Sequence, residues 1–394
     1  MADRYCIQTL NNISTRGLER LPRERYEVAS AIGRPDAVLV RSADMHKITL
    51  PDSVLGVARA GAGTNNIPLA ALAKRGIPVF NTPGANANAV KELVIAGMLM
   101  AARNIGPAWN FARGLSGDDA AIDVATEKGK KDFVGFELPG RTLGIVGLGA
   151  IGVAVANSAL ALGMNVVGYD PQLTVQRALQ LSSSVQQALS LDDLFARSDV
   201  VTVHVPLNDH TKGLVNAARL QLMRRGGIVL NFARAGVVDE PAVLGALDAK
   251  HLHAYVCDFP KNVLKDHPKV ITLPHLGAST EEAEENCAVM AADQLRDFLE
   301  NGNLRNAVNY PEAILPRVPG TTRLAIANDN VPNMVGQIST CLATAKVNIA
   351  DLLNKSRGEF AYTLIDTDSG LDQAIVDRIR AIHGVLSARI VQGP

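Results

Sequence analysis

Three glycines and one acid have the types and the spacing of a nucleotide-binding turn. Gly147, Gly149 and Gly152 follow an apolar stretch and open a helical one, and Asp170 closes the next apolar stretch. Glycines allow a tight strand-to-helix turn in which a pyrophosphate can reach the helix amides. The acid then stands where it can accept hydrogen bonds from a ribose. The pattern predicts a dinucleotide site.

The residues around this turn favour one of the two nicotinamide dinucleotides. Ala150 and Ile151 begin the helix, so their amides would face the pyrophosphate. The Asp170 carboxylate would repel a 2′-phosphate, and no arginine follows in residues 171–173 to receive one. We therefore expect NAD as the cofactor; the alternative is a glycine-rich turn without a ligand.

Two further residues have the chemistry of a substrate anchor and a proton carrier. Arg234 and His275 each follow an apolar stretch, and ligands of open α/β sheets bind at the carboxyl edge of the strands. An arginine there can form paired hydrogen bonds with a carboxylate. A histidine can exchange a hydroxyl proton near neutral pH. The alternatives are a surface ion pair for Arg234 and a structural role for His275.

These side chains require strands that end at a common edge. Apolar stretches alternate with helical ones along most of the chain, which is typical of a doubly wound parallel sheet in an α/β protein. Strands are expected at residues 37–40, 54–60, 77–81, 166–169, 200–205, 227–231, 254–258 and 270–273. Long helices are expected at residues 89–102 and 281–299, and a polar segment at residues 114–131.

The C-terminal part has a different order of elements. Three prolines and a glycine in residues 311–320 predict a linker. Beyond it, strands are expected at residues 323–327, 348–353, 360–366 and 385–391, with helices at residues 331–345 and 371–382. This βαββαβ order predicts a ferredoxin-like module over residues 321–394.

Composition excludes several functional classes. The 394 residues include 39 basic and 39 acidic ones, so nothing indicates a nucleic-acid partner. Four separated cysteines form no CxxC pair, which favours ordinary thiols in a reducing compartment and no metal site. The N-terminus lacks the apolar run of a signal peptide, and the apolar helices are too short for a bilayer. These features predict a cytoplasmic protein without a membrane partner.

Several motifs together resemble the D-isomer-specific 2-hydroxyacid dehydrogenases. They are the glycine turn at 147–152 and residues 59–67, 81–86, 205–207, 234–240 and 274–280. The resemblance implies a flavodoxin-like substrate domain interrupted by a Rossmann domain. Its expected parts are residues 1–90 and 276–310 for the substrate domain and residues 91–275 for the NAD domain.

The resemblance also implies roles for individual residues. Arg234 would orient the substrate carboxylate, His275 would take the hydroxyl proton, and Asp258 would lie beside the nicotinamide. The other cofactor contacts would come from Val205, Pro206, Phe232, Ala233, Gly277 and Ala278. The substrate would meet Arg59, Ala60, Gly61 and Asn86, and a substrate phosphate could also meet Lys91 or Lys131. Each lysine could instead be a solvated surface residue.

One departure concerns the partner of His275. The family has a glutamate before a proline in the loop that follows the Asp258 strand, but residues 258–268 of this chain contain none. Asp258 or Asp266 could substitute. In the family, the glutamate hydrogen-bonds the imidazole and raises its pKa. Lys261, in the same loop, would instead lower the pKa of the imidazole. Alternatively, Lys261 would itself carry a proton or contact a phosphate.

The C-terminal module resembles an ACT domain, a sensor of small molecules on biosynthetic enzymes. Asn328 and Asn330 match its first loop and Asn348 its second strand. Their amides could bind an amino acid, and serine is the effector that the resemblance implies. The alternative is a module that dimerises without a ligand.

Taken together, the resemblance implies an oxidoreductase that begins serine biosynthesis by oxidising 3-phosphoglycerate with NAD, as a homodimer or homotetramer. Two alternatives stay open. One is a dehydrogenase for another small 2-hydroxy acid, such as a reductase of glyoxylate or hydroxypyruvate. The other is a catalytically inactive protein that binds NAD as a sensor.

Overall fold

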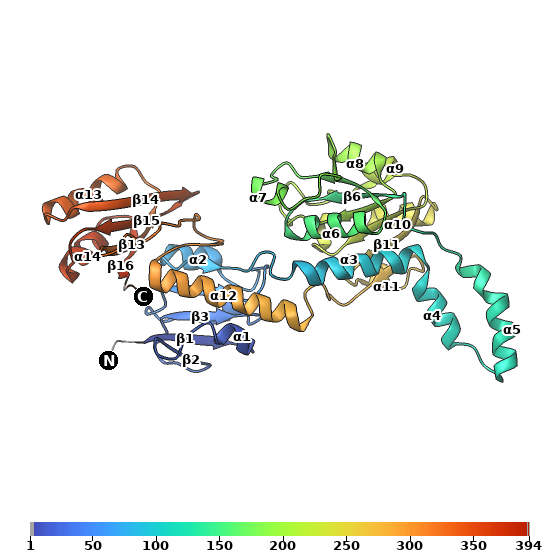
Figure 1. Cartoon of the computed structure of the whole chain (residues 1–394), viewed down its shortest axis with the longest axis horizontal. Coiled ribbons are helices and arrows are strands. Elements are labelled where there is room, and N and C mark those ends of the chain that lie inside the picture. Colours follow the sequence, from blue (N-terminus) through green and yellow to red (C-terminus); the bar gives the residue numbers. More distant parts are fainter. Residues whose placement is uncertain (1–3, 392, 394) are drawn as a thin grey trace. The chain divides into compact units, whose positions relative to one another are not determined.

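The computed structural model describes residues 4–391 and 393, which form two compact units. Unit 1 contains Met1–Asn86 and Glu281–Pro394, and unit 2 contains Ala87–Thr280 (Figure 1). We expected the divisions after residues 90 and 275. They fall four and five residues away because two uninterrupted helices, α3 (Ala87–Ala102) and α12 (Glu281–Asn301), begin there and each packs within its own unit.

The N-terminal part of unit 1 is a five-stranded parallel sheet in the order β2-β1-β3-β4-β5. This is the flavodoxin-like order that we expected. Its strands and helices are β1 (Tyr5–Leu10), α1 (Thr15–Leu18), β2 (Tyr26–Ala29), β3 (Ala37–Val40), β4 (Gly56–Arg59), α2 (Leu69–Lys74) and β5 (Val79–Phe80). The sequence did not reveal β1 and β2, because both are only partly buried and neither has a continuous apolar run or a regular alternation of polar and apolar residues.

Helix α12 covers this sheet and has clear end signals in its sequence. Glu281, Glu282 and Glu284 occupy its first turn, where acidic side chains favour the helix dipole. Gly302 follows its last residue with a φ of +73°, the left-handed conformation that commonly ends helices. Between these ends its buried face contributes Leu295 and Phe298 to the core.

The C-terminal module has the predicted βαββαβ order. Its elements are β13 (Thr322–Asp329), α13 (Met334–Thr344), β14 (Ile349–Arg357), β15 (Phe360–Thr367), α14 (Gln373–Arg380) and β16 (Val385–Val391). The strands form an antiparallel sheet in the order β14-β15-β13-β16. The two helices and one sheet face enclose a core of their own.

The other face of this sheet shares a hydrophobic core with the N-terminal part of unit 1. Tyr362 and Leu364 belong to the same cluster of buried residues as Phe298. Residues 311–320, which we expected to form a linker, begin inside this junction: Ala313 and Leu315 are buried. The segment still connects α12 to β13, and its prolines mark changes of chain direction without showing whether the segment is buried.

A buried ion pair fastens the same junction. Arg323 and Asp366 are both fully buried, and two hydrogen bonds of 2.6 Å join them. Arg323 also donates to the carbonyl oxygens of Asn301, Leu315 and Pro316. A buried charge pair is tolerated when its remaining donors are satisfied, and these carbonyls satisfy them.

Unit 2 contains a seven-stranded parallel sheet in the order β12-β11-β10-β9-β6-β7-β8. The strands are β6 (Thr142–Val146), β7 (Asn165–Tyr169), β8 (Gln186–Gln187), β9 (Val200–Val203), β10 (Gly227–Asn231), β11 (Leu252–Cys257) and β12 (Val270–Thr272). The helices are α3, α6 (Ala150–Ala161), α7 (Val175–Ala178), α8 (Leu191–Arg197), α9 (Ala217–Leu222), α10 (Glu240–Asp248) and α11 (Asn262–Lys265). This confirms the doubly wound fold, with its switch point between β6 and β9.

A helical arm follows α3. It consists of α4 (Ile105–Arg113), α5 (Asp119–Gly129) and a 3₁₀ turn, η2 (Lys130–Phe133) (Figure 1). We expected only a polar segment at residues 114–131, but Asp118 caps α5 by accepting from the amide of Ala121. None of the three elements has a buried residue, and Trp109 and Val124 are exposed.

No helix in the described part of the chain is long and apolar enough to cross a membrane. The four cysteines are free thiols, of which Cys257 and Cys287 are buried.

Candidate active site

In the glycine turn, two of the three glycines are required because a side chain would clash there, and the third borders open space. Gly147 has a φ of +91°, and a Cβ there would lie 2.7 Å from the carbonyl oxygen of His204. A Cβ at Gly152 would lie 2.0 Å from the carbonyl oxygen of Gly147. No atom lies within 4 Å of a Cβ built at Gly149. The chain around Gly149, at the start of α6, is therefore open to a ligand.

Asp170 holds the turn in place. Its Oδ2 accepts from the amide of Leu148 at 2.9 Å, and its Oδ1 accepts from the amide of Gln172 at 2.8 Å. A carboxylate has about four lone-pair positions, so acceptor capacity remains for ribose hydroxyls. The acid thus serves the fold of the turn as well as the ligand that the turn would hold.

The cofactor residues beyond the turn lie at the carboxyl ends of the neighbouring strands. Val205 and Pro206 follow β9, and a Cβ at Gly147 would lie 2.9 Å from Val205. Ala233 follows β10. The side chain of Phe232 is buried in the core near Gly97, so a cofactor contact there would involve its backbone.

Asn231 shapes the loop that presents Arg234. It is fully buried, its Oδ1 accepts from the amide of Ala233 at 3.1 Å, and its Nδ2 donates to the carbonyl oxygen of Arg234 at 3.0 Å. The Arg234 side chain is exposed and donates to the carbonyl oxygen of Ala233 at 2.6 Å. Asn231 was not among the residues expected from the sequence; the signal for it is a polar side chain at the end of an otherwise apolar strand.

His275 lies at the end of β12 in an unusual backbone conformation. Its φ is +47°, in the left-handed region, and its amide donates to the carbonyl oxygen of Asp258 at 3.0 Å. Its ring is exposed and stands 5.3 Å from the ring of Phe259, centroid to centroid. The backbone therefore turns the imidazole out of the protein interior, as a proton carrier requires.

Asp258 connects these elements. Its side chain is 1% exposed, its Oδ2 accepts from the amide of Gly277 at 3.2 Å, and its Oδ1 has no partner among the described residues. Burial raises the pKa of its carboxyl, while the Gly277 amide and the charges of His275 and Arg234 oppose that rise. Both cationic candidates therefore act electrostatically on one carboxylate, whose free oxygen fits a carboxamide donor of a nicotinamide.

Lys261 has a partner that the sequence did not suggest. Its Nζ lies 2.8 Å from Oε2 of Glu240, a nearly buried residue in the first turn of α10. Asp266, one of the two acids that we considered for His275, pairs instead with Lys265 at 3.3 Å and is exposed. Of those two acids, only Asp258 contacts the His275 segment among the described residues.

The substrate-binding candidates of unit 1 form a local arrangement around Arg59. Its Nε donates to Oδ1 of Asn66 at 3.0 Å, and Nδ2 of Asn66 donates to the carbonyl oxygens of Ala43 and Arg41. A Cβ at Gly61 would lie 2.3 Å from Nη1 of Arg59, so glycine leaves room for the guanidinium. Asn66, which orients Arg59, was not among the residues expected from the sequence.

The remaining substrate candidates differ in their surroundings. Ala60 is buried at the end of β4, and Oδ1 of Asn86 has no hydrogen-bond partner among the described residues. Lys91, on α3, pairs with Glu92 at 3.5 Å. Lys131 is exposed on η2 and belongs to the arm.

The effector candidates of the C-terminal module separate into two places. Asn328 and Asn330 line a cavity of about 160 Å³, together with Asn354, which the sequence did not single out. Oδ1 of Asn328 is buried without a partner among the described residues. Asn348 does not line this cavity: its Nδ2 donates to Oδ2 of Asp368 at 2.8 Å.

Comparison with known proteins identifies the family of the chain. Residues 95–277 match the model of the NAD binding domain of D-isomer specific 2-hydroxyacid dehydrogenases. D-3-phosphoglycerate dehydrogenase of Escherichia coli K12 is 36% identical over an alignment of 343 residues. The alignment covers 84% of this chain and 79% of that protein. The Dictyostelium discoideum enzyme of the same name is 28% identical over 416 residues, which cover 99% of this chain and 98% of the relative.

A solved structure agrees with both. The NAD⁺-bound 3-phosphoglycerate dehydrogenase of Entamoeba histolytica matches with a TM-score of 0.60 and 26% identity, over 78% of this chain and 99% of that one. Fold, glycine turn and relatives together define an NAD-dependent dehydrogenase. The chain belongs to the family of D-isomer specific 2-hydroxyacid dehydrogenases. The expected α/β fold and the expected NAD cofactor are thereby confirmed.

Proposed function

We propose that this chain oxidises 3-phospho-D-glycerate at C2 to 3-phosphohydroxypyruvate, the step that begins the phosphorylated route to L-serine. The observation that carries the proposal is the grouping of Arg234 and His275 around the Asp258 carboxylate in the unit with the glycine turn. The names of the relatives support the choice of substrate.

The protein residues divide the work of the reaction. Arg234 binds the substrate carboxylate through paired hydrogen bonds and so orients C2. His275 accepts the proton of the C2 hydroxyl as the carbonyl forms. NAD, when bound along the glycine turn, supplies the acceptor for the hydride that leaves C2. Asp258 positions the His275 segment, because its carbonyl oxygen accepts from the His275 amide and its Oδ2 accepts from the Gly277 amide.

The phosphate of the substrate requires cations of its own. We assign Arg59 to the phosphate. Asn66 accepts a hydrogen bond from its guanidinium, and Gly61 leaves room for it because it has no side chain. Lys261 is the second candidate. Its ammonium nitrogen lies 2.8 Å from the Glu240 carboxylate, and a cation fixed in this way suits a phosphate contact.

The proposal is tested by NADH formation with a panel of 2-hydroxy acids. We expect 3-phosphoglycerate to be preferred, and His275→Ala to lower kcat by about 10²- to 10⁴-fold. His210→Ala, an exposed histidine elsewhere in unit 2, is the matched control. Preference for an unphosphorylated acid would reassign the substrate. NAD binding without turnover of any acid would indicate a sensor instead.

The C-terminal module is proposed to be an ACT domain that binds L-serine. The buried, unpartnered Oδ1 of Asn328 in its 160 Å³ cavity supports a polar ligand there. Calorimetric titration with serine should show binding that Asn328→Ala removes and Asn348→Ala retains. A module without a ligand would give no heat. Regulation requires in addition that serine changes the rate or the substrate affinity.

We further propose a homo-oligomer in which a second copy of this chain covers the arm. Trp109 is 58% exposed and Val124 is 70% exposed on helices that bury no residue. Exposed apolar side chains on an arm without buried residues are candidates for contact with a second copy. Sedimentation velocity should show a dimer or tetramer, which Trp109→Ser combined with Val124→Ser should shift toward monomer.

A further inference from the structure

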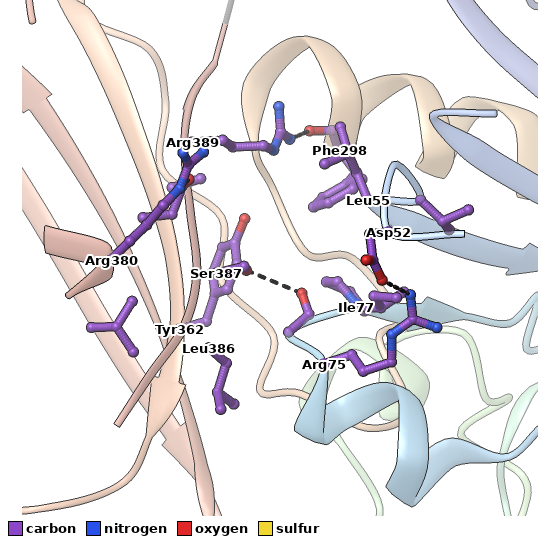
Figure 2. Close-up of a pocket in the computed structure, with 16 residues that line it drawn as sticks. Asp52, Leu55, Arg75, Ile77, Phe298, Tyr362, Arg380, Leu386, Ser387 and Arg389 are labelled. Atoms are coloured by element: carbon purple, nitrogen blue, oxygen red, sulfur yellow. Dashed lines mark hydrogen bonds and ion pairs between the residues drawn. The ribbon is translucent and has the colours of Figure 1, made fainter. Parts of the chain in front are cut away.

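A cavity of about 470 Å³ lies inside unit 1, where the C-terminal module meets the N-terminal sheet (Figure 2). One wall comes from the segment around Arg75, Gly76 and Ile77, and the other from α14 and β16. Ser387 Oγ donates to the carbonyl oxygen of Gly76 at 3.2 Å and so joins the two walls. The volume is that of a site for a small molecule.

The charged residues of this cavity are mostly arginines, and they come from both walls. Arg75 stands on the N-terminal side, and Arg380 and Arg389 stand on the side of the module (Figure 2). Asp52 is the acid in the lining; it pairs with Arg75 at 3.1 Å and is otherwise exposed. Arg380 pairs with Asp377, which is also exposed, at 3.0 Å.

Arg389 has no carboxylate partner among the described residues. It donates to the carbonyl oxygens of Phe298 and Leu299 at 2.5 and 3.3 Å, and its guanidinium lies 4.7 Å from the centre of the Phe298 ring. A guanidinium has five N–H donors, so these bonds leave some unused. The cavity thus offers donors and positive charge, and its remaining lining is mainly apolar.

We propose that this cavity is a second binding site, for a small organic anion with at least two acid groups. One acid group meets Arg75 and the other meets Arg380 and Arg389, because these arginines stand on opposite walls. Arginine recognises carboxylates and phosphates equally well by geometry, so the acid groups can be of either kind. A ligand bound to both walls ties the module to the N-terminal sheet.

The test is calorimetric titration of the full chain with citrate and with inorganic pyrophosphate, in chloride buffer. We expect saturable binding of at least one of them, weakened about tenfold or more by Arg75→Gln and by Arg380→Gln. Arg378→Gln, an exposed arginine on α14 outside the lining, is the matched control and should bind as the unmodified chain does. Thermal melting in chloride shows that each variant is folded.

Two further arms separate this site from the active site. Arg234→Gln should leave the heat of binding unchanged, and saturating NAD should not displace the anion. Acetate, with one acid group, should bind far more weakly. The proposal is overturned if neither probe binds, if Arg378→Gln and Arg380→Gln lose binding equally, if Arg234→Gln abolishes it, or if acetate binds as well as citrate.

Discussion

Lys261 Nζ and Glu240 Oε2 are 2.8 Å apart, and they come from positions 21 residues apart in the chain. The lysine side chain is 48% exposed, whereas that of the glutamate is 9% exposed. The loop without the family's glutamate therefore carries a cation that a buried acid holds in place. Lys261 therefore has a structural partner as well as a proposed contact with the substrate, and the two roles can be measured separately.

Lys261→Met should affect stability and substrate binding together. Removing the ammonium leaves a nearly buried carboxylate unpaired, which we expect to cost about 1 kcal/mol in the free energy of unfolding because the pair is half exposed. The KM for 3-phosphoglycerate should rise about tenfold, since a phosphate contact is worth roughly that much. Urea unfolding and initial rates measure the two effects.

The control for Lys261 is Lys265→Met, whose partner Asp266 is exposed. We expect it to change neither stability nor KM. Lys261→Arg should keep the KM for 3-phosphoglycerate close to that of the unmodified chain if the positive charge is what matters. A Lys261→Met enzyme with unchanged KM and lowered kcat would point to proton transfer instead.

Asp170→Asn should weaken the preference for NAD over NADP. The amide oxygen can still accept one of the two backbone bonds from Leu148 and Gln172, so the turn should persist. Loss of the negative charge removes repulsion of a 2′-phosphate. We expect the ratio of kcat/KM for NAD to that for NADP to fall by about tenfold or more, and an unchanged ratio would refute the role of the carboxylate.

Gly61→Ala should impair Arg59 without removing it. The added Cβ would lie 2.3 Å from Nη1 of Arg59, and Gly61 has a φ of +155°. We expect the KM for 3-phosphoglycerate to rise, in the direction of Arg59→Ala but less far, while the KM for NAD stays within about twofold. Equal effects on the two constants would count against Arg59 as a phosphate ligand.

His204 should make stability depend on acidity. Burial lowers its pKa from 6.5 to about 3, and its Nε2 lies 3.0 Å from Oγ1 of Thr202. Below pH 6.5 the unfolded chain binds a proton that the folded chain does not bind until about pH 3. This contribution to stability is therefore complete above pH 6.5 and is lost as the pH falls, by at most about 1.4 kcal/mol per pH unit.

The measurement compares urea unfolding of the unmodified chain and His204→Gln near neutral pH and at mildly acidic pH. The variant should lose less stability on acidification, because glutamine does not titrate. Both proteins must be measured through a probe of unit 2, since a chain with two units need not unfold in one step. Parallel losses would show that other groups set the acid dependence.

Local signals in the sequence were sufficient to predict the strand–turn–helix with its glycines, the NAD cofactor and most of the sheets. The glycine turn, Asp170 and the buried strand β10 each depend on neighbours within a few residues, so spacing alone predicted them. The C-terminal order of elements was predicted for the same reason. Arg234 and His275 could be predicted as candidates because each stands next to an apolar run, where a strand ends.

The tertiary structure decided which residues meet across long separations. Contacts between distant segments leave no periodic signal in the sequence, because they depend on how the strands are ordered. Examples are the pairs Lys261–Glu240, Arg59–Asn66 and Arg323–Asp366. The burial of residues near 313 and 315 was hidden for the same reason. What the sequence alone determined was the nucleotide turn and the substrate class; the partners that hold the reactive side chains came only from the fold.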